Sequence, residues 1–475
     1  MKGTLSDLKA APAVWGAVWF SLVVSQTVVC SIVAARTAID LDYHGSEQGV
    51  GANLAGPVMV FSVLIAVFVL LWVVTAALNQ RRNQLALLVL QGATPVQLLI
   101  RNLAMLVVLF IAAAVVSCLL TPVVTPYLFA LLIKAFDLSL TYKNAHVLAS
   151  IRTGLIIAGV TVLVSSVLTV RSLSKIRPIE ALRQSQNPPE QVNALRLIAG
   201  LLLIAGSWCM LVLPGLATGK MNLQELAHST GKNPIESKTT GFIAFSMGGM
   251  FLLIFALAVL APYIVRWFTK GWTRLVPVPS SAWNIARQQA AGRIRRQSAT
   301  IIPVTAGLSL LMTFSGLLHT LADSLKNLSG AGSGTSLSPH MLTNLMAMLG
   351  PALIIAFAGA VSGLLITAKG RSLDAALTYV SGAQIGQLRA LGMLDGVITM
   401  VTATLLAFII TLISTSGTAF MLDRYLGSAH LSIQWDYWAV IVLVAAGVGA
   451  VATGVQACVT RYQDSIRIIS RTIGE

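Results

Sequence analysis

Ten stretches of the chain contain no aspartate, glutamate, lysine or arginine. A helix needs about 20 apolar residues to cross a bilayer, and each stretch comes close to or exceeds that length. They lie at 10–35, 48–80, 102–133, 153–170, 197–219, 239–265, 297–322, 341–368, 396–421 and 437–460. The pattern predicts an all-α polytopic membrane protein with about ten transmembrane helices.

Composition supports this interpretation. Of the 475 residues, 56% are hydrophobic and only 10% are charged, and the mean hydropathy of +0.82 is far above that of an ordinary soluble domain. The first apolar stretch continues to Arg36 and is longer than the apolar core of a signal peptide. We therefore expect it to be the first spanning helix rather than a cleaved leader.

Basic residues are distributed unevenly between the two sides of the predicted topology. With the N-terminus inside, 23 of the 32 lysines and arginines fall in cytoplasmic segments, and the whole net charge of +16 lies on that side. The positive-inside rule then predicts a multi-pass protein of the plasma membrane with both termini in the cytoplasm. Short basic loops between apolar helices are explained by topology and anionic membrane lipids, so no nucleic-acid partner is expected.

Two parts of the chain align at a constant offset of 290 residues. Between 81–98 and 371–388, seven positions are identical: Arg81/Arg371, Ala86/Ala376, Leu87/Leu377, Gly92/Gly382, Ala93/Ala383, Gln97/Gln387 and Leu98/Leu388. The same offset pairs Arg171, Ile176, Arg177 and Ile179 with Arg461, Ile466, Arg467 and Ile469. Compositional similarity between apolar helices does not explain matching arginine, glycine and glutamine in polar loops, so we infer a duplication.

The duplication predicts three parts in the chain. Residues 1–185 form a first four-helix repeat, residues 186–275 a two-helix spacer, and residues 276–475 a second four-helix repeat preceded by an amphipathic elbow helix. Both repeats begin and end on the inner side, so they are expected to be parallel rather than inverted. One chain then contains its own pseudo-twofold axis, and no obligatory homodimer is required.

The loop after the second predicted helix reads as a surface helix, a turn and a new helix. Gly92 is suited to a positive φ at the end of one helix, and Thr94-Pro95 is a good N-cap and first turn for the next. In the second repeat Gly382 keeps the break, and the segment from Gln384 to Leu388 restarts the helix without proline. A non-acidic helical turn presented twice at the same place suits two copies of one docking partner.

An amphipathic segment precedes the seventh span. Pro277 and Pro279 break the preceding structure, and Ser280 or Ser281 is the expected N-cap. Trp283, Ala286, Ala290 and Ile294 share one face of the predicted helix. The arginines, expected to face lipid headgroups, are Arg287, Arg293, Arg295 and Arg296. We expect this elbow to lie at the inner membrane surface and to turn into the membrane near Ser298, and 4–16 is a shorter counterpart.

These segments resemble the FtsX-like permeases of ABC transporters. The basic elbow NIARQQAAGRIRRQ, the loop LALLVLQGATPVQLLIRNL and the sequence KIRPIEALRQ at 175–184 are similar to the family's elbow, its E-x-A-x-L-R-A-x-G-A coupling segment and its closing P-x-E-A-L-R. Four plus two plus four helices look most like the bacitracin-resistance type. Two departures are a connection of only about twenty residues (323–340) where that type has a large extracellular domain, and Ile468 opposite Pro178.

The resemblance implies that each repeat presents a coupling helix to one of two cytoplasmic ATPase subunits. The implied coupling residues are Arg82, Leu88, Gln91, Gly92, Ala93, Thr94, Gln97, Arg371, Ser381, Gly382, Ala383 and Gln387. The chain itself has no P-loop, because GLATGK at 215–220 is one residue short. We therefore expect no enzymatic activity and no cofactor in this chain, with ATP and magnesium bound by the partner ATPase.

Other chemistry is poorly supported by the sequence. The predicted spans have no ionisable residue near their centres, which disfavours a proton- or ion-coupled carrier. Cys30, Cys118, Cys209 and Cys458 lie far apart within the spans and are expected to be small buried side chains. No metal site is predicted. The six histidines are expected on the outer side, which leaves open a haem-contacting outer face: His44, His146, His228, His319, His340 and His430.

The favoured hypothesis is an ABC exporter permease that transmits ATPase closure to the outer face and expels or releases an amphipathic substrate. By resemblance alone, the substrate is an antimicrobial peptide, a lipid or a hydrophobic drug. One alternative is a sensory or scaffold membrane protein that couples the state of the ATPase to a histidine kinase. A haem exporter is the other.

Overall fold

The computed structural model describes residues 12–42, 46–80, 92, 94–136, 147–173, 194–217, 234–276, 280–292, 294–328, 340–426, 431, 433 and 435–459. Within these ranges every regular element is a helix. The helices are α2 (Pro12–Asp42), α3 (Ser46–Gln80), α5 (Pro95–Phe136), α6 (Val147–Leu173), α8 (Ala194–Ala217), α10 (Pro234–Leu275), α11 (Ser281–Gly292), α12 (Ile294–Leu328), α13 (His340–Val380), α14 (Ile385–Leu426) and α15 (Trp435–Val459).

Each predicted apolar stretch corresponds to one long helix, and α11 is the predicted elbow. Among the described residues, eight helices are long and apolar enough to cross a membrane. The remaining two, α6 and α15, contribute shorter apolar segments at Ser150–Val164 and Trp438–Gly454. The prediction of an all-α polytopic membrane protein is therefore confirmed.

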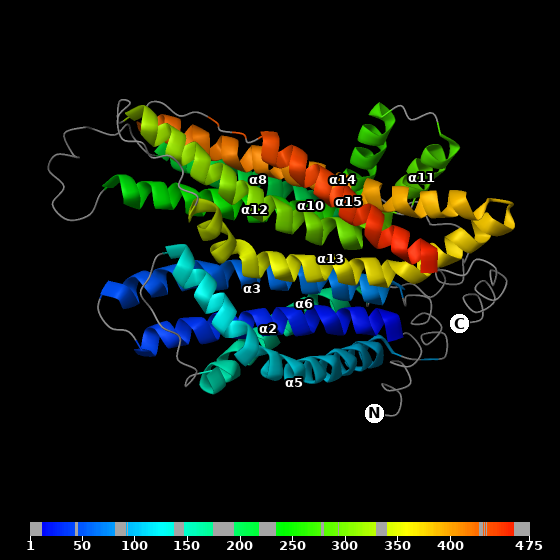
Figure 1. The fold of residues 1–475 in the computed structure, drawn as a ribbon, viewed down its shortest axis with the longest axis horizontal. Coiled ribbons are helices and arrows are strands. Elements are labelled where there is room, and N and C mark those ends of the chain that lie inside the picture. The colour runs from blue at the N-terminus through cyan, green and yellow to red at the C-terminus, as the bar shows by residue number, and fades with distance from the viewer. Residues whose placement is uncertain are drawn as a thin grey trace.

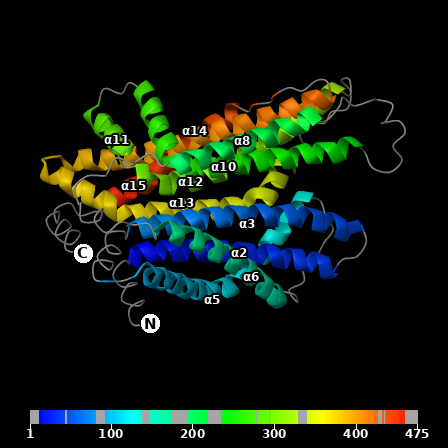
Figure 2. The same cartoon turned by 180° about the vertical axis from the view of Figure 1, so that it is seen from behind.

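The helices lie roughly side by side along the long axis of the molecule (Figure 1). In both views α2, α3, α5 and α6 form one group, and α13 lies between α3 and the group of α8, α10, α12, α14 and α15 (Figures 1 and 2). The two groups share one apolar core, to which α2 contributes Val18, α3 Val69, α12 Leu310, α13 Ile355 and α14 Ile410.

Close packing joins the groups where α13 meets α2 and α3. The Ser362 hydroxyl donates a hydrogen bond to the carbonyl oxygen of Ala17, 2.9 Å away. Gly359 lies so close to Val69 that a Cβ on the glycine would overlap the valine side chain. Small residues permit such close approach between membrane helices, where packing rather than water drives association.

The two helices of the predicted spacer pack on each other and on α12 and α14. Helix α10 also reaches the first group, because Phe251 stacks on Phe61 of α3 and Phe255 lies edge-on to Phe68. The spacer is therefore part of the bundle and contacts both predicted repeats.

The fourth helix of each predicted repeat packs differently. Helix α6 contacts α2, α3 and α5, whereas α15 packs mainly against α14. Helix α15 therefore lies at the edge of the bundle, and the valines and leucine on its outward face are exposed: Val440, Leu443, Val444, Val448 and Val451. In a membrane this face meets lipid.

Candidate functional site

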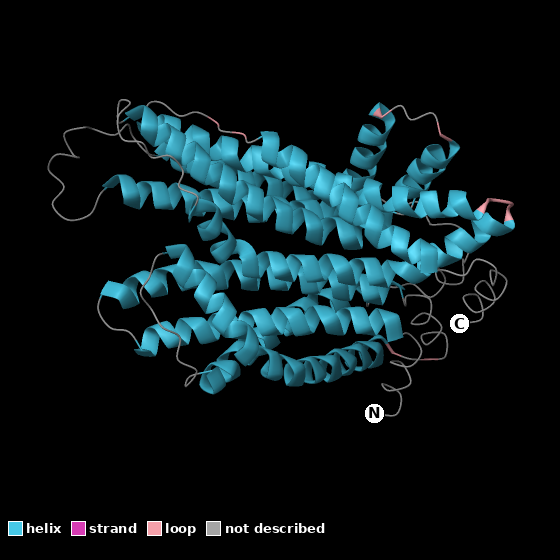
Figure 3. Ribbon diagram, viewed as in Figure 1, coloured by secondary structure: helices cyan, strands magenta, loops and turns pink. Residues whose placement is uncertain are grey.

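The connection between α13 and α14 is a tight turn at one end of the bundle. It projects furthest on the right of Figure 1, and its loop residues are drawn in Figure 3. Gly382 has a φ of 99°. Its N–H donates to the Tyr379 carbonyl at 2.9 Å, and the Ala383 N–H donates to the Thr378 carbonyl at 3.2 Å. This is the Schellman pattern, which closes a helix by placing one residue in the left-handed region. The glycine predicted to end the helix does so.

The next helix starts three residues after Gly382. Helix α14 begins at Ile385, and the Gln387 side-chain oxygen accepts a hydrogen bond from the Gln384 N–H at 3.1 Å. The side chain thereby satisfies a backbone donor that has no partner inside the helix. The predicted restart without proline is confirmed.

Gly92 makes the corresponding turn before α5, at the same end of the molecule. Its φ is 95°, within a few degrees of that of Gly382. Thr94 and Gln97 then form a reciprocal capping box. The Thr94 hydroxyl oxygen accepts from the Gln97 N–H at 3.3 Å, and the Gln97 side-chain oxygen accepts from the Thr94 N–H at 3.0 Å. Pro95 is the first residue of α5, as predicted.

The described coupling candidates are mostly exposed. Gly92, Thr94, Gln97, Ser381, Gly382 and Gln387 are exposed, and Ala383 is half-buried. Arg371 lies within α13, and Arg82, Leu88, Gln91 and Ala93 lie outside the described residues. The structure therefore groups Ser381, Gly382, Ala383 and Gln387 around one turn, and Gly92, Thr94 and Gln97 around the other.

Exposed apolar side chains lie beside both turns and were not predicted from the sequence to be site residues. Leu377 and Val380 in the last turn of α13 are 51% and 62% exposed, and Val96 and Ile100 in the first turns of α5 are 64% and 59% exposed. Their only sequence signal is their position next to a predicted turn. Apolar side chains at an exposed helix end are suited to contact another protein.

The elbow α11 packs against the beginning of α14. The Ser280 hydroxyl oxygen caps the helix by accepting from the Trp283 N–H at 3.1 Å. Trp283, Ala286 and Ala290 share one face as predicted, and this face is buried against Leu391 and Ile398 of α14. The apolar face of the elbow therefore meets protein rather than lipid.

The turn from the elbow into the next helix comes earlier than predicted. Helix α11 ends at Gly292 and α12 begins at Ile294, whereas the sequence placed the change of direction near Ser298. Ser298 is instead buried within α12. Arg287 is half-buried, the side chains of Arg295 and Arg296 are not described, and Arg293 lies outside the described residues. Their contact with lipid headgroups stays a prediction.

Two polar contacts fix α14 next to this elbow. The Gln297 side-chain amide donates to an Asp395 carboxylate oxygen at 2.7 Å and joins α12 to α14. The Trp272 indole N–H of α10 donates to the Thr402 hydroxyl at 2.9 Å, and the Trp272 ring lies edge-on to Trp283. Three elements thus hold residues 391–402 in the first half of α14, the helix that follows the Gly382 turn.

The described cysteines differ in how exposed their side chains are. Cys30 is buried as expected, but Cys118 is half-buried and Cys209 is exposed on α8. An exposed apolar surface is not penalised in lipid, so burial rules for water-soluble proteins do not apply to Cys209. Across the described ranges, no three histidine, cysteine, aspartate or glutamate residues gather in one place.

Part of the chain matches a known family model. Residues 57–178 match the FtsX-like permease C-terminal domain, a range that contains most of α3, the Gly92 turn, α5 and α6. No curated protein matches the chain. The chain therefore contains an FtsX-like permease domain and is a multi-pass membrane protein.

Proposed function

We propose that this permease subunit binds two copies of a cytoplasmic ABC ATPase, one at the Gly92 turn and one at the Gly382 turn. Closure of the ATPases moves the two helical groups relative to each other and expels or releases an amphipathic substrate on the opposite face. Both chain termini and both turns then lie on the cytoplasmic side. The ATP and magnesium are bound by the ATPase, and this chain contributes no catalytic group.

The observation that carries this proposal is the repeated backbone geometry of the two turns. Two glycines 290 positions apart adopt φ values of 95° and 99°, and each is followed by a glutamine that caps the next helix through its side-chain oxygen. Apolar side chains stand exposed beside both turns. FtsX-like permeases pair with ABC ATPases, and two equivalent surfaces on one chain suit two copies of such a subunit.

The firm attachment of α14 supports mechanical transmission. A force applied at the Gly382 turn acts on a helix that is bonded to α12 through Gln297 and Asp395, and to α10 through Trp272 and Thr402. Because α14 runs on for 42 residues, displacement at its start reaches the other end of the bundle as a movement of one rigid element.

Replacement of both glycines tests the docking role. We expect Gly92→Val together with Gly382→Val to weaken co-purification of the ATPase strongly, because a β-branched residue does not tolerate a positive φ and the turn must change shape. The control is Gly386→Ala in the first turn of α14, where a Cβ meets open space and φ is ordinary. Normal ATPase recovery by the folded double variant removes the docking assignment.

A further inference from the structure

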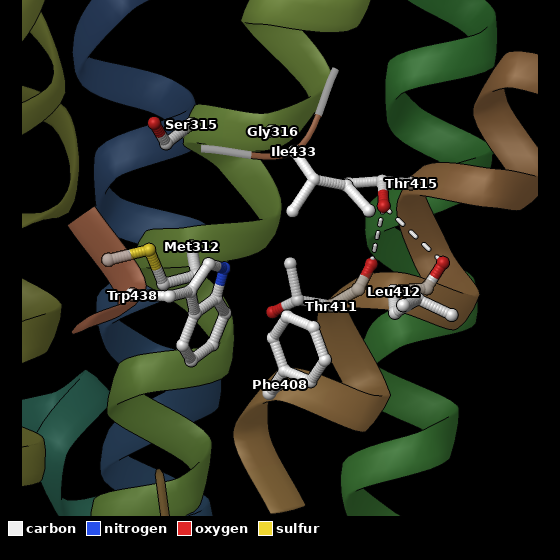
Figure 4. A pocket seen from close by; sticks show the side chains of 9 residues that line it. All are labelled: Met312, Ser315, Gly316, Phe408, Thr411, Leu412, Thr415, Ile433 and Trp438. Carbon is white, nitrogen blue, oxygen red and sulfur yellow. Dashed lines mark hydrogen bonds between the residues drawn. The ribbon is translucent and has the colours of Figure 1, made fainter. Parts of the chain in front are cut away.

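A hollow lies between α12, α14 and the beginning of α15, in the halves of these helices that are remote from the Gly382 turn (Figure 4). Helix α12 contributes Met312 and Gly316 to its lining, α14 contributes Phe408 and Thr415, and α15 contributes Trp438. None of these residues belongs to the coupling turns or to the elbow.

Helix geometry explains why space remains here. Near the Gly382 end, α14 and α15 touch at Gly396 and Gly449, where a Cβ on Gly396 would overlap the Gly449 carbonyl oxygen and the Thr453 hydroxyl. Further along, the Phe408 ring lies edge-on to Trp438 with centroids 4.9 Å apart, so two aromatic side chains separate the same helices. The pair therefore diverges from a point of backbone contact.

Gly316 of α12 lines the hollow and lets Thr415 of α14 approach closely. Gly316 presents no side chain to the hollow, and a Cβ at this position would lie 2.7 Å from Cγ2 of Thr415. Helices α12 and α14 are held at this spacing by the Thr313 and Thr411 hydroxyl groups, whose oxygens are 3.3 Å apart. The hollow is thus a feature of the packed helices.

The two threonine hydroxyl groups drawn in the hollow are already hydrogen-bonded inside the protein. The Thr415 hydroxyl donates to the carbonyl oxygens of Thr411 at 2.8 Å and Leu412 at 3.3 Å, and both bonds are drawn in Figure 4. Back-bonding of this kind satisfies a hydroxyl within its own helix. With the Thr411 hydroxyl next to that of Thr313, the surface left for an occupant is mainly the thioether of Met312 and the rings of Phe408 and Trp438. An apolar group fits these walls.

The residues around the hollow indicate that this apolar group comes from the membrane. Ile409 and Leu412 beside the hollow are exposed on α14, and Trp435 and Val440 are exposed on α15. These apolar surfaces face lipid in a membrane, and tryptophan at the end of a spanning helix is typical of the boundary between hydrocarbon and headgroups. The hollow is therefore continuous with a lipid-facing surface just below that boundary.

We infer that this hollow binds an acyl chain of a bilayer phospholipid, from the leaflet opposite the coupling turns. The chain enters past Leu412 and lies against Phe408 and Trp438. This inference requires only that the bundle spans a membrane and is independent of ATPase docking.

Photolabelling tests the site. The intact protein is placed in vesicles of phosphatidylethanolamine and phosphatidylglycerol that contain phosphatidylethanolamine with a diazirine on one acyl chain, and labelled peptides are identified by mass spectrometry. We expect 408–415 and 433–438 to be labelled several-fold more than 198–202, a simple lipid-facing segment of α8. Equal labelling of these segments overturns the proposal.

Variants that fill the hollow separate binding from general lipid contact. Ile433→Trp and Met312→Phe each add a ring to the lining and should reduce labelling of 408–415 several-fold. Val440→Trp adds the same bulk to the exposed face of α15 and should leave the labelling unchanged. If folded Ile433→Trp and Met312→Phe proteins both label like the parent, the hollow is not the binding site.

Discussion

Single glycines set the geometry of the chain in two different ways. At Gly92 and Gly382 the missing Cβ permits a positive φ, and at Gly382 this conformation ends α13. At Gly396 and Gly449 it permits two backbones to touch. Both uses depend on glycine, but the first is visible in the sequence as a break between helices, whereas the second lies inside an uninterrupted apolar run and gives no local signal.

The backbone contact of α14 and α15 gives a prediction about stability. Gly396→Val must push α15 away from α14, because the new side chain overlaps the Gly449 carbonyl and the Thr453 hydroxyl. Overpacking of this kind costs about 1–3 kcal/mol, so we expect a lower midpoint of thermal unfolding in detergent. Gly447→Val on α15 is the matched control, since a Cβ there meets nothing within 4 Å. Equal midpoints for the two variants contradict the close contact.

Among the elements, the stretches without charged residues correctly located every long helix that the structure describes. They did not give the helix ends. Helix α13 continues to Val380 and α10 to Leu275, well beyond the apolar stretches, because a helix outside the bilayer tolerates charged residues such as Lys270. Leu377 and Val380 lie in this extension of α13 beyond the apolar stretch, so the pattern of spans did not predict that they are exposed beside the turn.

The sequence did not predict which helices pack against each other. Trp283 was predicted on the apolar face of the elbow, but its contact with Leu391 depends on α14, which is distant in sequence. Likewise, α6 and α15 have similar composition and pack on different neighbours. When all faces of a helix are apolar, periodicity does not indicate which face meets protein and which meets lipid.

The elbow packing predicts how firmly α14 is held. Trp283→Ala removes a buried ring from between Trp272 and Leu391, a loss of about 3 kcal/mol or more for a well-packed tryptophan. We expect faster amide hydrogen exchange in 385–398 with little change in α2. Trp267→Ala is the control, because Trp267 on α10 is 79% exposed. Unchanged exchange in 385–398 means that the elbow does not support α14.

For the whole molecule, one chain with two equivalent turns has a direct consequence for assembly. The two helical groups share a single core, and α13 packs against both α2 and α3, so one polypeptide presents both turns on one packed bundle. If each turn docks one ATPase as proposed, we expect one chain to bind two ATPases without a second permease subunit.

Stoichiometry therefore tests the complete arrangement. Native mass spectrometry of the complex in detergent should give one permease chain with two ATPase subunits. Gly92→Val alone should leave a species with one ATPase, and so should Gly382→Val alone, because each variant distorts one turn and leaves the other with its hydrogen bonds intact. Two permease chains in the parent complex, or loss of both ATPases from either single variant, contradicts two independent docking turns on one chain.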